Sequence, residues 1–285
     1  MANKKSFLKL DSVPIIPSLS IKIPSVGEIL EDEQTYYQLT YTLTMSPFSC
    51  MVQLDDMGID YTKITEWELF IQTFQQYINY LKPLDSKVIQ LEKELEITSD
   101  EFYMQQLQQE LTEVNITRDR LWNTSGLDLL FEKTDLGNFT LSIDEERDIM
   151  VLYNPVTNAV IDERVYKDIA DTIRKINLYE HIKSKPGNES AKKYLLEKER
   201  RKLKRNAKKP YKPYLEKLVI ALVNNKDFPY DYESCMDLSI YCFNQSLKQI
   251  QHNISFDKTM TGVYAGTINI NKMADKDCLS WIPTK

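Results

Sequence analysis

Apolar residues recur every three or four positions in a stretch that begins at Thr65, and this spacing constrains the fold more than any other feature. The series is Trp67, Phe70, Ile71, Phe74, Tyr77, Ile78 and Leu81. Such spacing places one apolar stripe along an α-helix. Thr65 and Glu68 have the spacing of a capping box, which satisfies backbone N–H groups where a helix begins. We therefore predict an amphipathic helix from Thr65 to Pro83, because proline interrupts the hydrogen bonds of a helix.

The segment 85–122 continues the helical spacing in two parts. Its apolar positions are Val88, Leu91, Leu95, Phe102, Leu107, Leu111, Val114 and Leu121. The polar residues Thr98-Ser99-Asp100-Glu101 separate the two parts, and charged residues occupy the other faces. This pattern predicts a helical hairpin or a short coiled coil.

The remaining segments add further helices and a small β element. Seven glycines in 285 residues favour long helices, because tight turns commonly need glycine. Helical spacing recurs after Ser25, after Asp162 and in the C-terminal part. Alternation in 139–143 and the apolar run 149–153 predict a β-hairpin at about 137–154. The expected fold class is mainly α with a small β-hairpin element (α+β), similar to a helical bundle.

The same pass along the chain predicts three parts. Pro14, Pro17 and Pro24 prevent a helix near the start, so we expect residues 1–24 to form an extended N-terminal arm. Residues 25–125 should form an N-terminal helical domain. Residues 126–285 should form a C-terminal helical domain that contains the hairpin and a basic helix at about 190–209.

Cysteine spacing and hydropathy indicate a soluble cytoplasmic protein. Cys50, Cys235, Cys242 and Cys278 lack both the paired spacing of a zinc site and the density of a secreted disulfide scaffold. We expect reduced thiols. No apolar run has the length of a signal peptide or reaches the roughly 18 residues of a membrane span. We therefore expect no membrane partner.

Tests for cofactor and metal chemistry give no positive result. Gly262 and Gly266 are close together, but no Lys-Ser/Thr follows them as in a phosphate-binding loop, so we expect a turn there. His181 and His252 lie far apart, and neither has other ligands at metal-binding spacing. We expect structural histidines and no cofactor.

Two further chemical alternatives remain open after this test. Asp55, Asp56 and Asp60 could suggest a cation site, but no bidentate Glu ends a calcium-loop pattern, so we favour a helix cap or polar loop. No Gly-x-Ser-x-Gly turn marks a nucleophile. An enzyme would need a site that only folding assembles, and we expect no catalytic residues and no metal.

The segment from Lys183 to Lys212 is strongly basic. It holds thirteen Lys and Arg against three Glu in a chain of net charge −6. The candidate basic contacts are Lys192, Lys193, Arg200, Arg201, Lys204 and Arg205. Such a helix could neutralise phosphates of a nucleic acid. A solvated face or a contact for an acidic protein is the favoured alternative, because the acidic remainder of the chain would repel a polyanion.

Aromatic residues on the predicted helices form a second candidate surface. Its members are Trp67, Phe70, Phe74, Tyr77, Tyr241, Phe243 and Trp281. Large aromatic side chains suit a contact in which an apolar partner helix is covered. Stripes of this kind more often belong to the protein's own core, and that alternative stays open.

Short motifs near both ends of the chain carry a family resemblance. They are Ile23-Pro24-Ser25-Val26-Gly27-Glu28-Ile29-Leu30, Met57-Gly58-Ile59-Asp60-Tyr61, the stretch from Asp237 to Leu247, the stretch from Thr261 to Ile268, and Leu279-Ser280-Trp281-Ile282. These motifs resemble those of tail assembly chaperones from tailed bacteriophages of low-GC Gram-positive hosts. The predicted hairpin and basic helix have no counterpart in a minimal chaperone of that kind.

The resemblance implies a noncatalytic phage tail assembly factor. Such a chaperone binds the long helical tape measure protein and keeps it soluble while the tail tube forms. It would act in the host cell cytoplasm, and retention in the virion stays open. The alternatives are a nucleic-acid-binding protein that uses residues 190–212 and a structural tail or baseplate component. The oligomeric state does not follow from the sequence.

Overall fold

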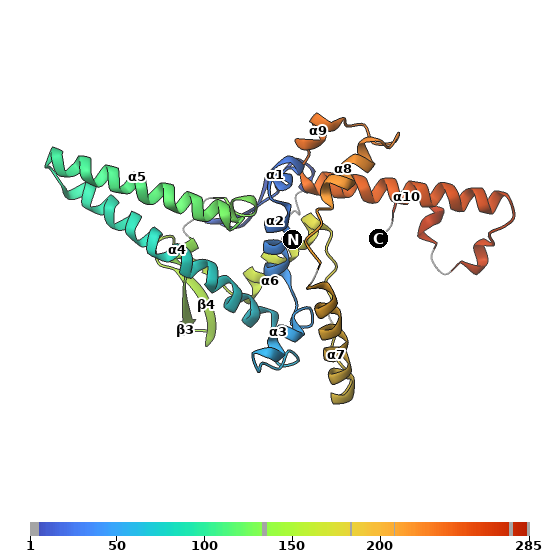
Figure 1. Ribbon diagram of the computed structural model, residues 1–285, viewed down its shortest axis with the longest axis horizontal. Coiled ribbons are helices and arrows are strands. Elements are labelled where there is room, and N and C mark those ends of the chain that lie inside the picture. Colours follow the sequence, from blue (N-terminus) through green and yellow to red (C-terminus); the bar gives the residue numbers. More distant parts are fainter. Residues whose placement is uncertain (1–5, 133–135, 183, 208, 274–275, 284–285) are drawn as a thin grey trace. The chain divides into compact units, whose positions relative to one another are not determined.

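The computed structural model describes residues 6–132, 136–182, 184–207, 209–273 and 276–283. The chain divides into two compact units (Figure 1). Unit 1 contains the described parts of 1–9, 24–31 and 213–285, and unit 2 contains 10–23 and 32–212. The bounds of these units differ from those of the predicted domains, 25–125 and 126–285. The short segment 24–31 packs with residues that lie about two hundred positions later in the chain, so unit 1 contains both.

The described residues confirm the predicted fold class. They are 62% helical, with ten helices and antiparallel sheets of two and three strands. The helices of unit 2 are α2 (Glu33–Thr44), α3 (Met51–Asp56), α4 (Glu66–Ile97), α5 (Glu101–Thr124), α6 (Glu163–Asn177) and α7 (Glu189–Asn206). Its strands are β1 (Ser12–Ile16), β2 (Leu19–Lys22), β3 (Thr140–Asp144), β4 (Ile149–Asn154) and β5 (Ala159–Ile161).

Helices α4 and α5 form the predicted helical hairpin (Figure 1). The Thr65 hydroxyl accepts a hydrogen bond from the Glu68 N–H at 3.1 Å, and the Thr65 N–H donates to Glu68 Oε2 at 2.7 Å. This reciprocal pair is the predicted capping box. The predicted end at Pro83 is wrong, because α4 continues through Pro83 to Ile97. Proline removes one N–H from the helix, but packing of α4 against α5 on both sides of Pro83 holds the helix together.

A buried ion pair joins the two arms of this hairpin. Arg118 Nε of α5 lies 2.6 Å from Asp85 Oδ1 of α4, and both side chains are largely buried. The Gly137 N–H donates to Asp85 Oδ2 at 2.8 Å. A Cβ at Gly137 would lie 2.7 Å from backbone atoms of Leu81 and Lys82, so only glycine fits at this crossing.

The N-terminal segment of unit 2 is a β-hairpin. Strand β1 pairs antiparallel with β2, and the side chains of Leu19 and Ile21 are fully buried. The Lys22 N–H donates to the Leu130 carbonyl at 2.9 Å, so the hairpin also pairs with a later segment. The extended conformation predicted for residues 1–24 is therefore present in β1 and β2. The segment 24–31, which follows, belongs to unit 1.

The second sheet has three strands in the order β3-β4-β5. Strands β3 and β4 form the predicted hairpin, with Leu141 opposite Leu152. Strand β5 extends it, and the Leu152 and Ile161 side chains are fully buried. Helix α6 follows, and its buried face includes Tyr166 and Ile173.

Unit 1 is built from two distant segments. Its helices are α1 (Val26–Glu31), α8 (Leu215–Val223), α9 (Tyr232–Met236) and α10 (Ile240–Tyr264). The Val26 N–H donates to the Leu238 carbonyl at 2.9 Å, and the Ile240 N–H donates to the Pro24 carbonyl at 2.8 Å. Val26 and Ile29 are fully buried. Residues 24–31 are thus part of the core of this unit.

None of the helices in the described part of the chain combines the length and apolar character that crossing a membrane requires.

Candidate functional site

Helix α7 carries the basic segment and is anchored along one edge. The Asn188 side chain caps its start by accepting the Ala191 N–H at 2.8 Å. Leu196 is buried in a small apolar cluster, and Leu195 packs against the same cluster. The buried members of the cluster are Cys50, Met51, Val52, Leu54, Tyr61, Leu69 and Leu196. Two leucines therefore fix which face of an otherwise polar helix points inward.

Lys192 pairs with the segment beneath α7. Its Nζ lies 2.8 Å from Asp60 Oδ1 and 5.8 Å from the centre of the Tyr61 ring. The Lys192 ammonium holds the pKa of the Asp60 carboxyl well below its usual range, and hydrogen bonds from Thr62 add to this effect. The Asp60 carboxylate in turn raises the pKa of Lys192. Lys192 is therefore used to attach α7 to its own unit.

Arg200 makes the second attachment, eight residues further along α7. Its two terminal nitrogens lie 2.5 Å from Asp55 Oδ2 and 2.6 Å from Asp56 Oδ1, and these carboxylates raise the pKa of Arg200. After α7 the Tyr211 hydroxyl donates to Glu33 Oε1 at 2.8 Å. The three aspartates that the sequence left open as a cation site thus pair with α7. In the described part of the chain, no group of three His, Cys, Asp or Glu could hold a metal ion.

The outer face of α7 keeps cations without such partners. Arg201 pairs with Glu197 of the same helix at 3.1 Å. Lys193, Lys198, Lys204 and Arg205 form no ion pair with any carboxylate of the described residues, and their side chains are exposed. The predicted basic contacts therefore divide into an inner pair, Lys192 and Arg200, and an outer group. Only the outer group could bind another molecule without first breaking contacts of unit 2.

Most of the predicted aromatic contacts in α4 belong to the core. Trp67, Phe70 and Phe74 are buried, and neighbouring rings lie 5.8 and 4.9 Å apart. Phe70 also packs on Tyr166 of α6 at 4.6 Å, and burial raises the pKa of Tyr166 to about 12. Tyr77 is partly buried, and burial raises its pKa. The aromatic stripe on α4 is therefore part of the protein's own core, which is the alternative that the sequence had left open.

The aromatic residues in unit 1 differ in exposure. Phe243 is fully buried and lies 6.5 Å from the Phe228 ring. Tyr241 is half-buried against Phe7 at 5.5 Å. Trp281 is 63% exposed, although its carbonyl accepts a hydrogen bond from Gln249 Nε2 at 2.9 Å. Of the seven predicted aromatic contacts, Trp281 is the one that is largely open to a partner.

The C-terminal part of unit 1, from 251 to 283, has no buried residue among those described. We call it the C-terminal module; it comprises the second half of α10 and the segment that folds back on it. His252 Nε2 contacts the Ser280 carbonyl at 2.7 Å. The exposed large apolar residues of the module are Ile254, Tyr264, Ile270, Trp281 and Ile282. Five exposed large apolar side chains thus lie within this one segment of the chain.

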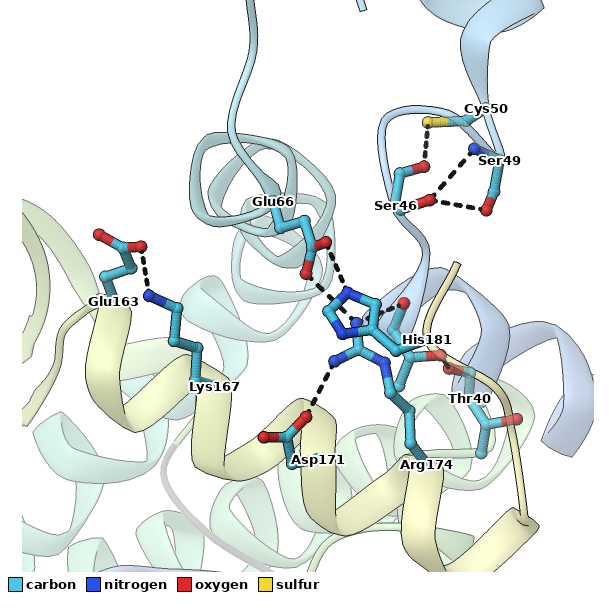
Figure 2. Close-up of polar contacts among 11 residues, drawn as sticks. Thr40, Ser46, Ser49, Cys50, Glu66, Glu163, Lys167, Asp171, Arg174 and His181 are labelled. Atoms are coloured by element: carbon cyan, nitrogen blue, oxygen red, sulfur yellow. Dashed lines mark hydrogen bonds and ion pairs between the residues drawn. The ribbon is translucent and has the colours of Figure 1, made fainter. Parts of the chain in front are cut away.

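A polar cluster joins α4 to the end of α6. In Figure 2, Arg174 and His181 converge on Glu66, the first residue of α4. Arg174 Nη2 lies 3.3 Å from Glu66 Oε2 and 2.9 Å from the Thr44 carbonyl, and His181 Nε2 lies 2.7 Å from Glu66 Oε1. Asp171 binds Arg174 at 3.1 Å. Each charged group faces an opposite charge, as in a structural tie between helices.

Two cavities flank this cluster and share Ser46 and Ile182. Their volumes are about 430 and 320 Å³. The nearby Cys50 thiol is held at 3.4 Å from the Ser46 carbonyl (Figure 2), and burial raises the pKa of this thiol to about 11. A nucleophilic thiol needs a lowered pKa, so the environment of Cys50 favours a structural role.

A family model described as the YomV second domain matches residues 205–284. YomV is the product of a Bacillus phage gene, so the YomV match supports a phage-derived origin for the chain. No curated protein and no solved structure matches.

The YomV match includes the C-terminal module with its five exposed large apolar residues. It contains α8, α9, α10 and the C-terminal module. It omits residues 24–31, which complete the core of unit 1. Sequence spacing alone could not reveal this completion, nor the pairing of Asp55, Asp56 and Asp60 with α7, because both depend on residues far apart in the chain.

Proposed function

We propose that the protein is a noncatalytic phage tail assembly factor that binds an apolar helix of another tail protein. The single observation that carries the proposal is the C-terminal module, which exposes five large apolar residues and has no buried residue among those described. The phage origin supported by the YomV match and the resemblance to tail assembly chaperones agree with this role.

The chemistry of the module favours an apolar protein partner. Tyr264 is 83% exposed and Trp281 is 63% exposed. The charges of residues 251–283 balance, with Lys258, Lys272 and Lys276 against Asp257, Asp275 and Asp277. A surface with little net charge and large aromatic side chains suits the apolar face of a helix and gives no attraction for a polyanion. The tape measure protein, a long helical chain, is the partner we propose.

Copurification tests the proposal. The tagged protein is expressed together with the products of the neighbouring genes and purified in low and high salt. We expect a long helical protein to be recovered and to remain bound in high salt, since apolar contacts are not screened. Tyr264→Ser combined with Trp281→Ser should abolish this recovery. Tyr80→Ser is the matched control, because Tyr80 is a tyrosine of α4 that is 70% exposed.

Three results would contradict the proposal. Equal recovery of the helical protein by wild type and by the Tyr264/Trp281 variant would exclude the module as the binding surface. Recovery of nucleic acid that is lost in high salt would instead favour the basic face of α7. Detection of the protein in purified phage particles, without binding to the tape measure protein, would favour a structural tail or baseplate component.

A further inference from the structure

The outer face of α7 is a basic surface with an aromatic residue on it. Tyr194, Lys198 and Arg205 lie at spacings of four and seven residues, which places them on one side of the helix. Tyr194 is 64% exposed. Lys193 and Lys204 flank this stripe, and neither pairs with a carboxylate in the described part of the chain. The inner edge is fixed to unit 2, so this outer face is held rigidly toward solvent.

The tip of the α4–α5 hairpin has the opposite charge and exposed apolar residues. None of the residues 92–106 is buried. Ile97 is 81% exposed and Phe102 is 71% exposed. Glu92, Glu96 and Glu101 surround them and make no ion pair with a described cation. The tip therefore combines unpaired acids with apolar side chains that nothing in unit 2 covers.

We infer that the tip of the α4–α5 hairpin of one copy of this chain docks on the outer face of α7 of a second copy. The acids of the tip would meet Lys198, Lys204 and Arg205. Ile97 and Phe102 would lie against the exposed ring of Tyr194. Each copy carries both surfaces, so the contact is heterologous and repeats head to tail.

Charge complementarity favours a second copy over a nucleic acid. Both halves of the contact are on the same chain, and each lacks an ionic partner among the described residues. A polyanion would satisfy the cations of α7 but would leave Ile97 and Phe102 uncovered and would be repelled by a chain of net charge −6. The inference does not depend on the C-terminal module, which lies in the other unit.

Sedimentation velocity across a range of protein concentrations tests the inference. In low salt we expect association that grows with concentration, and in high salt a large shift toward the monomer, because exposed ion pairs are screened. The helix variant Lys204→Glu/Arg205→Glu and the tip variant Glu92→Lys/Glu96→Lys should each remain monomeric in low salt.

Mixing provides the decisive arm of the test. The helix variant keeps the acidic tip but loses the basic face of α7, and the tip variant keeps that face but loses the acidic tip, so neither associates with itself. An equimolar mixture should form a 1:1 complex, because the intact tip of the helix variant meets the intact α7 face of the tip variant. The matched controls are Glu145→Lys/Glu146→Lys in the β3–β4 turn and Lys217→Glu/Lys226→Glu in unit 1, which change the net charge equally and should associate like wild type. Circular dichroism checks that every variant is folded.

The inference is overturned if wild type stays monomeric in low salt, or if the mixture does not associate although both variants are folded. It is also overturned if the helix variant associates like wild type and loses binding only to a single-stranded oligonucleotide. That last result would assign the outer face of α7 to nucleic acid.

Discussion

The pKa of a single carboxylate, Asp60, depends on the contact that attaches α7 to the rest of unit 2. The Lys192 ammonium at 2.8 Å holds its pKa well below the ordinary value. Because the folded pKa is lower than the unfolded one, the contact stabilises the fold above about pH 4. This contribution is lost as the pH falls through the folded pKa.

We predict that Lys192→Met raises the pKa of Asp60 toward the ordinary aspartate value of 3.8. The titration is followed by the carboxyl carbon chemical shift in NMR. Lys193→Met is the matched control, since Lys193 is the adjacent lysine and points away from Asp60. An equal titration midpoint in both variants would disprove the assigned pairing.

The buried pair Asp85–Arg118 leads to a stability prediction. Asp85→Asn should lower the free energy of unfolding by about 3 kcal/mol, because it removes the buried Asp85 charge that lies 2.6 Å from Arg118 Nε. Urea unfolding measures the change. Glu113→Gln on the exposed face of α5 should change it by less than about 0.5 kcal/mol.

A second variant separates charge from packing at this position. Asp85→Leu combined with Arg118→Met removes both charges together and should recover most of the loss. If this double variant were as unstable as Asp85→Asn, the effect would come from packing around Gly137 and not from the loss of the Asp85–Arg118 ion pair.

At the scale of single elements, the sequence predicted where α4 begins better than where it ends. The capping box at Thr65 is local, so the start of α4 could be deduced from four residues. The end could not, because the proline rule neglects the packing that carries α4 through Pro83 to Ile97. The basic helix was also predictable from composition. Which of its cations are paired was not, since Asp55, Asp56 and Asp60 approach α7 only in the folded unit.

Pro83 therefore costs stability that packing offsets. Its side chain is exposed, and its missing N–H leaves the helix one hydrogen bond short. Pro83→Ala should raise the free energy of unfolding by roughly 1–3 kcal/mol. Thermal unfolding measures the change, with Lys82→Ala as the control at the adjacent exposed position. A lower stability of Pro83→Ala would contradict the prediction.

At the scale of the whole molecule, the order of residues does not follow the two units. Unit 1 takes Val26 and Ile29 from the segment 24–31 and the rest of its described core mainly from beyond residue 213. No periodicity in the sequence indicates that the segment 24–31 packs in unit 1, because the contacts join residues about two hundred positions apart. The sequence accordingly predicted α1, α8 and α10 of unit 1, but not α9 and not which of these helices pack together.

This arrangement predicts that a fragment of residues 205–285 is less stable than unit 1 in the whole chain. The fragment lacks two fully buried side chains, each worth about 1.5–3 kcal/mol, and the backbone pairing with Leu238 and Ile240. Circular dichroism should show reduced helicity and a broadened melt. Fusing residues 24–31 to the fragment should restore both, whereas a fused segment with Val26→Ser and Ile29→Ser should not. Full helicity of the unfused fragment would contradict the prediction.

The same arrangement has a consequence during translation. The segment 24–31 leaves the ribosome some two hundred residues before its partners at Leu238 and Ile240, which takes roughly 10–40 s at ordinary bacterial elongation rates. Unit 2 can fold in that interval, since its last residue precedes the main part of unit 1. During this interval the apolar side chains of Val26 and Ile29 remain exposed to solvent, because the residues that bury them have not yet been synthesised. The speed of synthesis from residue 32 to residue 240 thus sets how long the growing chain is open to capture by the host's own folding machinery.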